Sequence, residues 1–209
     1  MGVSDDKESG WAPQSGYTWE DYIRRTKNDA PSPLLLRALP HLRAKTRALD
    51  LGCGALKDSR HLFSLEFGKV TALDANSPPG ELLPENSGRF EFVKSTFEDF
   101  AFPTAEFDLI NAQFVLPFIR PQNFARVFDS VLRALRTEGV FAGQFFGKED
   151  TWAADPEMSL HDASEAKALL RRGADLLYFC EEQIWGGTTA MGESKDWHIL
   201  HFIARRRAP

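Results

Sequence analysis

Two glycines and two acidic residues form the pattern in this sequence that could bind a ligand. Asp50, Gly52 and Gly54 lie at or just after the end of the apolar run Arg47–Leu51, and Asp74 ends the next apolar run. Glycines after a strand let a ligand approach the backbone, and a helix that starts there presents unpaired N–H groups. A carboxylate at the end of the following strand is placed to accept hydrogen bonds from ribose hydroxyls. The pattern therefore predicts a nucleoside-containing ligand at the ends of two neighbouring strands.

The glycine spacing differs from that of nicotinamide dehydrogenases. Those enzymes also begin with a glycine-rich loop and a ribose-binding acid, but a third glycine follows three positions after the second. Lys57 stands at that position here. An NAD(P)-dependent oxidoreductase is therefore a less favoured alternative.

Short apolar runs recur at regular intervals, and each has the length of a strand that is buried on both faces. They are Arg47–Leu51, Lys69–Leu73, Phe90–Val93, Phe107–Ala112 and Gly139–Phe146. Helical patterns alternate with or follow them, at Asp58–Glu66, Gln122–Leu135 and His161–Arg171. Two strand-like runs joined by a glycine-rich turn should then pair antiparallel, Asp175–Trp185 and Trp197–Arg206. We predict five βα units and a C-terminal hairpin, and hence an α/β, doubly wound, Rossmann-like domain with a mostly parallel seven-stranded sheet.

The N-terminal region precedes this alternation. Residues 1–16 are rich in Gly, Ser, Asp and Pro and are predicted to form a flexible arm. Two short helical patterns, Trp19–Asn28 and Leu34–Leu42, predict a helical cap over residues 17–45. Because 43% of the 209 residues are hydrophobic, we expect one domain over residues 17–209.

Charge, hydropathy and cysteine content argue against several function classes. The net charge of −5 provides no basic field for nucleic acid. No apolar run approaches the roughly 18 residues that cross a bilayer, and the N-terminus is acidic and polar, so we expect a cytoplasmic protein without membrane contact. Cys53 and Cys180 belong to no Cys/His cluster, which predicts reduced thiols and no metal site.

The segment Ala48–Gly54, together with Asp74, carries a family resemblance. The chain resembles class I methyltransferases that use S-adenosylmethionine, and the similarity extends over residues 17–206. The resemblance implies that Asp50 orients the amino end of the cofactor, that the two glycines line its methionine and ribose parts, and that Asp74 holds the ribose. The cofactor contacts that it implies are Asp50, Gly52, Cys53, Gly54, Asp74, Ala75, Thr96, Phe97, Glu98, Asn111, Ala112 and Arg25.

Some positions depart from the pattern of this family. Thr96 and Phe97 stand where the family usually has an acid and a small residue, so adenine recognition could fall to Glu98 or to backbone groups. Leu56 stands where many relatives have a third glycine, and we expect it to narrow the space beside the helix start. Residues 111–114 resemble the segment that flanks the transferable methyl group. They lack the Asn/Asp-Pro-Pro-aromatic sequence of the branches that methylate amides and base amino groups.

Further candidate contacts, to the cofactor or to the acceptor, lie on the N-terminal helix and in loops. In relatives this helix folds over the cofactor, so Arg25 could pair with the methionine carboxylate, with a solvated helix face as the alternative. Three aromatic residues could contact a substrate, with ordinary packing as the alternative: Tyr22, Phe114 and Trp152. No residue is assigned as catalytic. His198 and His201 are weak candidates for a general base, and structural or surface roles are the alternative.

The function implied is methyl transfer from S-adenosylmethionine to a small-molecule acceptor by in-line displacement. Residues 143–147 and 197–201 further resemble small bacterial methyltransferases of the tellurite-resistance type. A non-catalytic protein that binds S-adenosylmethionine for regulation or interaction is the alternative from another class. We expect a monomer or a homodimer.

Overall fold

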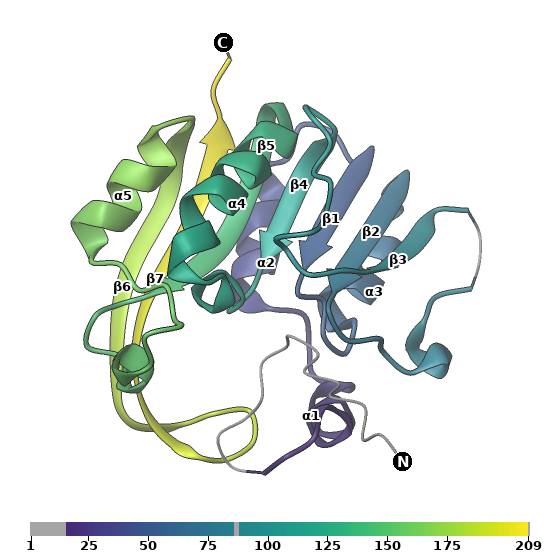
Figure 1. Cartoon of the computed structure of the whole chain (residues 1–209). Coiled ribbons are helices and arrows are strands. Elements are labelled where there is room, and N and C mark those ends of the chain that lie inside the picture. The colour runs from purple at the N-terminus through teal and green to yellow at the C-terminus, as the bar shows by residue number, and fades with distance from the viewer. Residues whose placement is uncertain (1–15, 86–87, 209) are drawn as a thin grey trace, which may run out of the picture.

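A seven-stranded sheet runs through the protein, which we describe from a computed structural model at residues 16–85 and 88–208 (Figure 1). The strand order is β3-β2-β1-β4-β5-β7-β6. The strands are β1 (Arg47–Leu51), β2 (Lys69–Asp74), β3 (Phe90–Lys94), β4 (Phe107–Ala112), β5 (Leu135–Phe146), β6 (Ala174–Thr188) and β7 (Ser194–Arg206). The first five are parallel, and β7 is antiparallel to both β5 and β6. The predicted mostly parallel sheet with a C-terminal hairpin is confirmed.

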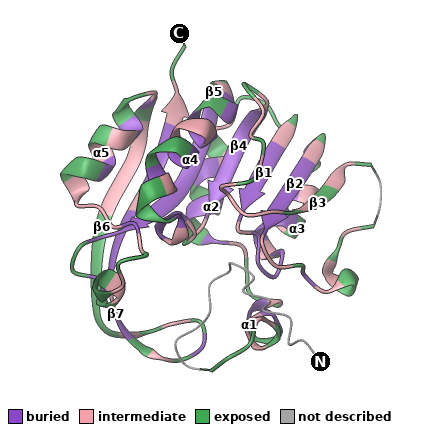
Figure 2. Cartoon of the chain, in the orientation of Figure 1, coloured by how far each residue is buried: buried purple, intermediate pink, exposed green. Residues whose placement is uncertain are grey.

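Helices cover both faces of this sheet (Figure 1). They are α1 (Trp19–Thr26), α2 (Pro33–Ala38), α3 (Lys57–Ser64), α4 (Pro121–Ala134) and α5 (Ala163–Arg171), with the 3-10 turns η1 (Leu39–His41), η2 (Gly80–Leu82), η3 (Leu116–Phe118) and η4 (Thr151–Ala154). The apolar face of α4, which includes Phe124, Phe128 and Val131, packs in one core with Phe141 and Phe145 of β5. Buried residues of α2 and α3 form the core on the other face of the sheet. Figure 2 shows the central strands buried between these layers, whereas the C-terminal half of β6 is largely exposed.

The strand order reverses between β1 and β4, because β2 and β3 extend the sheet to one side of β1 and β5 to the other. In open α/β sheets, ligands bind at the carboxyl ends of the strands beside such a reversal. In Figure 1, α1, η4 and the tip of the β6–β7 hairpin all lie at this carboxyl edge. The fold therefore directs the search for a site to the ends of β1, β2 and β4.

Two predictions about the connections are wrong. Instead of five βα units, the described residues of the β2–β3 link (75–85 and 88–89) and of the β3–β4 link (95–106) contain no α-helix. The adjacent Pro78 and Pro79 prevent a helix from continuing through the first of these links. The predicted glycine-rich turn is also misplaced, because Gly186 and Gly187 lie within β6 at a shift in register.

Residues 1–15 of the predicted N-terminal arm lie outside the described residues. The predicted cap helices are present but shorter, since α1 ends at Thr26 and α2 at Ala38, before a 3-10 turn. Within residues 16–85 and 88–208, none of the helices has the length and apolar character that spanning a membrane requires.

Candidate functional site

The turn that follows β1 has glycine at two positions whose conformation or surroundings disfavour a side chain. Gly52 and Gly54 adopt φ angles of 65° and 51°, in the left-handed region that side chains disfavour. A Cβ on Gly52 would overlap the side chain of Val115. The N–H groups of Gly52 and Cys53 donate to the Leu73 carbonyl of β2 at 2.8 and 3.1 Å. The turn is thus fixed to the neighbouring strand and leaves the Cα of its glycines uncovered by a side chain of their own.

Asp74 closes the turn from the end of β2. Its Oδ2 accepts the N–H of Gly54 at 3.0 Å, and its Oδ1 accepts the N–H of Asn76 at 2.8 Å. Burial raises the pKa of this carboxyl above its usual value, and the donated N–H groups act in the opposite direction. Ala75, half-buried, directly follows it. Asp74 therefore lies beside the glycine turn, as the sequence predicted.

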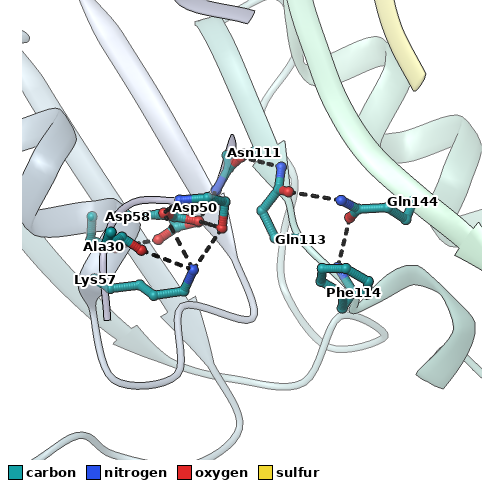
Figure 3. Close-up of polar contacts among 10 residues, drawn as sticks. Ala30, Asp50, Lys57, Asp58, Asn111, Gln113, Phe114 and Gln144 are labelled. Carbon is teal, nitrogen blue, oxygen red and sulfur yellow. Dashed lines mark hydrogen bonds and ion pairs between the residues drawn. The ribbon is translucent and has the colours of Figure 1, made fainter. Parts of the chain in front are cut away.

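Asp50 lies behind the turn, in a buried polar network (Figure 3). Its two carboxylate oxygens accept from Ser59 Oγ at 2.5 Å and from Asn111 Nδ2 at 2.7 Å. Asn111 Nδ2 also lies 3.2 Å from Oδ2 of Asp58. Burial, followed by repulsion from the Asp58 carboxylate, raises the pKa of Asp50 to about 7. Asp50 therefore orders the elements around the turn, and Asn111 uses its amide within the protein.

The network continues from the end of β4 to β5 (Figure 3). Gln113 Nε2 donates to Asn111 Oδ1 at 2.7 Å, and Gln144 Nε2 donates to Gln113 Oε1 at 2.9 Å. Gln144 Oε1 accepts the N–H of Phe114 at 2.9 Å. Phe114 has a φ of 58°, unusual for a bulky residue, and its side chain remains 39% exposed. We call this row, from Asp50 through Asn111, Gln113 and Gln144 to Phe114, the amide relay.

A cavity of about 90 Å³ lies between this network and α1. Its lining residues come from α1, the glycine turn, the start of α3 and the end of β4: Tyr22, Thr26, Asp50, Gly52, Cys53, Gly54, Ala55, Lys57, Asp58, Gln113 and Phe114. Six of these were predicted as site residues. Gln113 lies in the segment 111–114, which resembles the one that flanks the transferable methyl group. The sequence did not predict Thr26, Ala55, Lys57 and Asp58, although Asp58 lies in the first helical turn after the glycines, where a site residue could have been expected.

Tyr22 covers the glycine turn from α1. Its ring stacks on Trp19 with centroids 5.1 Å apart, and a Cβ on Gly54 would lie 3.3 Å from the Tyr22 ring. Burial, with Asp74 nearby, raises the pKa of the Tyr22 hydroxyl. A second cleft of about 350 Å³ lies on the other side of α1, lined by Trp19, Ile23 and the prolines after β2 among others. The helix α1 thus separates two spaces at the carboxyl edge.

Leu56 does not narrow the cavity as predicted. It adopts the left-handed conformation, with φ of 62°, which accounts for the glycine expected there. However, its side chain is completely buried, packs against Cys53 and Ala72, and is not among the residues that line the cavity. Burial also raises the pKa of the Cys53 thiol well above its usual value, which fits a packing role for Cys53.

The remaining cofactor candidates do not line the cavity. The Thr96 hydroxyl donates to Asp99 at 2.8 Å, and Phe97 packs against the main core. The Glu98 carbonyl accepts from Arg126 at 3.3 Å, and Ala112 is buried in the core. Arg25 is exposed, with its guanidinium beside Gly192 at the tip of the β6–β7 hairpin.

An aromatic cluster of Phe114, Phe146, Trp152 and Trp197 lies beyond the cavity, with ring centroids 5.6–6.3 Å apart. The buried Lys195 ammonium faces three of these rings, at 4.0 Å from Trp152, 4.2 Å from Trp197 and 4.9 Å from Phe146. Its ion-pair partner is Asp150, which is also buried. Trp152 therefore packs against the ammonium group of Lys195.

Both candidate histidines pair with carboxylates of β6. Nε2 of His198 lies 2.8 Å from Glu181, and Nε2 of His201 lies 3.0 Å from Glu182. Nδ1 of His198 also accepts the N–H of Glu149 at 3.3 Å. Neither histidine lines the cavity beside the glycine turn, so the structure supports the alternative of structural roles.

Comparison with known proteins adds a family match to this geometry. A family model for a methyltransferase domain matches residues 49–143, from β1 into β5. No curated protein sequence matches the chain significantly.

Several solved structures resemble the fold. The 1,6-didemethyltoxoflavin-N1-methyltransferase of Burkholderia thailandensis, which holds 1,6-didemethyltoxoflavin and S-adenosylhomocysteine, is 20% identical, with a TM-score of 0.64 over 91% of this chain and 81% of that one. The N-methyltransferase NodS of Bradyrhizobium japonicum, in complex with S-adenosylhomocysteine, is 16% identical, with a TM-score of 0.62 over 91% and 98%. TehB of Haemophilus influenzae is 16% identical, with a TM-score of 0.70 over 90% and 66%. At these identities the likeness concerns the fold, and it confirms the predicted methyltransferase-like architecture.

Proposed function

We propose that the chain is an S-adenosylmethionine-dependent methyltransferase that acts on a small-molecule acceptor. The observation that carries this proposal is the glycine turn after β1, with Asp50 behind it and Asp74 at the adjacent strand end. The turn lies where the strand order reverses, which is the usual ligand position on an open α/β sheet. The methyltransferase-domain match spans the turn and both acids.

The groups at the turn fit this cofactor chemically. Gly52 and Gly54 expose backbone that a ligand can approach, and the Asp74 oxygens keep lone pairs beyond the two N–H groups that they accept. Asp74 would accept from the ribose hydroxyls, and Asp50 would act on the amino end through its neighbours. When bound, the cofactor supplies a methyl group on a positively charged sulfur.

The helix α1 has to move for a ligand of this size to bind. The cavity of about 90 Å³ beside the turn is smaller than the roughly 300–1,000 Å³ of small-molecule sites. Tyr22 and Thr26 of α1 line that cavity, and Trp19 and Ile23 line the larger cleft behind the helix. Outward movement of α1 would join the two spaces. Asp58 holds the base of the segment that would bend, because its carboxylate accepts from the N–H and the hydroxyl of Ser32, both at 2.7 Å.

On the acceptor side, Gln113 and Phe114 line the same cavity at the end of β4. Their part in the proposed reaction is to align the acceptor and to exclude water, and such positioning contributes on the order of 7–11 kcal/mol. The neighbour that holds 1,6-didemethyltoxoflavin supports a small molecule as the acceptor.

One observation favours the alternative of a non-catalytic module. The Tyr22 ring fills the space over Gly54, as expected of a site that no longer admits its ligand. An intact cofactor site without an acceptor site would also fit such a module. Binding and turnover separate these alternatives.

Calorimetric titration with S-adenosylmethionine, S-adenosylhomocysteine and NADH tests the proposal. Binding of both sulfur compounds is the expected result, and a screen of small acceptors for release of S-adenosylhomocysteine would follow. Binding of NADH alone would replace the proposal with an oxidoreductase. Binding of neither sulfur compound would contradict it.

A further inference from the structure

The amide relay joins the cofactor side of the proposed site to its acceptor side. It begins at the carboxylates of Asp50 and Asp58 and ends at the backbone N–H of Phe114 (Figure 3). Its three amide side chains belong to Asn111, Gln113 and Gln144. Asn111 and Gln144 are 0% and 1% exposed, so water cannot replace their partners.

The carboxylates dictate the direction of every bond in the relay. A carboxylate oxygen that carries no proton only accepts hydrogen bonds, so Asn111 turns its Nδ2 toward Oδ1 of Asp50 and Oδ2 of Asp58. Its Oδ1 then accepts from Gln113, whose Oε1 in turn faces Gln144 Nε2. The Oε1 of Gln144 is thereby left to accept the N–H of Phe114. Reversal of one amide would place two donors or two acceptors opposite each other.

The backbone of Phe114 depends on the hydrogen bond that its N–H donates to Gln144 Oε1. A bulky residue at a φ of 58° is strained, and such strain persists only where neighbouring groups hold it. Phe114 is 39% exposed, so burial alone does not account for its backbone conformation. Its ring lies between the cavity and the rings of Phe146 and Trp197.

We propose that Gln144 is a positioning residue that holds Phe114 in its left-handed conformation and thereby fixes the acceptor wall of the site. The statement that this wall faces a methyl acceptor rests on the proposed methyltransferase function. The hydrogen bonds and the φ angle that carry the inference do not depend on the function.

Two variants of Gln144 test its role in opposite ways. Gln144→Met keeps the length of the side chain but removes both polar ends, so the Phe114 amide should exchange with solvent on the order of tenfold faster. Gln144→Glu can act like glutamine only while its carboxyl is protonated, donating to Gln113 and accepting from Phe114. Burial favours the protonated form, and once ionised the carboxylate has no donor for Gln113 Oε1. Protection of the Phe114 amide should therefore match the wild type at low pH and fall as the pH rises.

The measurement is hydrogen exchange of the Phe114 amide by NMR, corrected for the intrinsic pH dependence of exchange. Other titratable or charged groups around Gln144 are Asp50, Asp58 and Lys57 at the far end of the network and His201, its partner on β7. All four are present in the wild type and in the control Gln122→Glu, which places the same change at an exposed position of α4.

A pH-dependent loss of Phe114 protection in Gln144→Glu, absent from Gln122→Glu, supports the inference. Unchanged protection in Gln144→Met, or equal pH profiles in the two glutamate variants, would overturn it. S-adenosylhomocysteine binding by the wild type is measured in parallel. Failure of the wild type to bind that probe would refute the proposed function and leave the exchange result to decide the relay.

Discussion

Replacement of Asp74 by asparagine should weaken cofactor binding much more than it weakens the fold. The Asp74 oxygens accept N–H groups from Gly54 and Asn76 at 3.0 and 2.8 Å. Asparagine keeps one oxygen but turns an NH₂ group toward one of these donors. The lost partner costs about 1–3 kcal/mol of folding free energy. Loss of a charge-assisted bond to a ribose hydroxyl costs a further 1.5–3 kcal/mol of binding free energy, roughly a ten- to hundredfold increase in Kd.

Asp108→Asn is the matched control. Asp108 is as buried as Asp74, each being 8% exposed, but it lies near the start of β4, on the opposite edge of the sheet. Its Oδ2 also accepts two backbone N–H groups, from Thr46 at 2.7 Å and Arg47 at 2.9 Å. Its Oδ1 also pairs with Arg136 at 3.2 Å, so its replacement should lower stability at least as much and leave the ligand affinity unchanged.

The assay is calorimetric titration of both variants with S-adenosylhomocysteine, beside urea denaturation to measure their stability. The expected pattern is a loss of stability in both variants and a loss of affinity in Asp74→Asn alone. An equal loss of affinity in both would attribute the effect to general destabilisation. An unchanged affinity in Asp74→Asn would refute a role for this carboxylate in binding.

Three further variants test the structure. Tyr22→Ala should raise the association rate of S-adenosylhomocysteine severalfold in stopped-flow experiments, because the ring no longer has to leave the glycine turn; an unchanged rate would contradict movement of α1. Lys195→Met should lower the free energy of unfolding, measured by urea denaturation, by about 3–5 kcal/mol, because it leaves the buried Asp150 carboxylate without its cation. A decrease below about 1 kcal/mol would show that this ion pair is dispensable for stability. Asp50→Asn should change the pH dependence of stability: the folded state raises the pKa of Asp50 from 3.8 to about 7, so wild-type stability should fall, relative to the variant, as the pH rises through that range. Parallel stability curves for the two proteins would contradict the raised pKa.

The sequence predicts those parts of the fold that depend on local patterns. The strands β1 and β4 begin and end where their apolar runs do, since a strand buried on both faces is mostly apolar along its length. The helix α4 follows from its apolar spacing in the same way. The glycine turn and Asp74 were likewise recognisable, because both depend on residue type at a strand end.

The missed parts of the site depend on contacts between distant segments. Gln113 and Gln144 meet only because β4 and β5 are neighbours, and no periodicity marks an amide that points toward another amide. Lys195 reaches Asp150 in the same way, although lysine is rarely buried in proteins. The cofactor candidates Thr96 and Glu98 were placed by resemblance alone, and their described hydrogen bonds are local or lie on the backbone.

The two bulky residues in the left-handed conformation at this edge, Leu56 and Phe114, are held there in different ways. Leu56 buries its whole side chain, and burial of a leucine contributes about 1.5–3 kcal/mol, enough to offset the roughly 1–2 kcal/mol cost of its backbone. Phe114 has a similar φ but keeps 39% of its side chain exposed, so packing alone does not account for its conformation. The hydrogen bond from its N–H to Gln144 adds to the contacts of its ring with Phe146 and Trp197. A strained backbone conformation that a polar contact maintains, at a residue that lines a cavity, is typical of a functional site and not of a hydrophobic core. This difference is why substitution of Gln144 should alter the site, whereas substitution of Leu56 should alter stability.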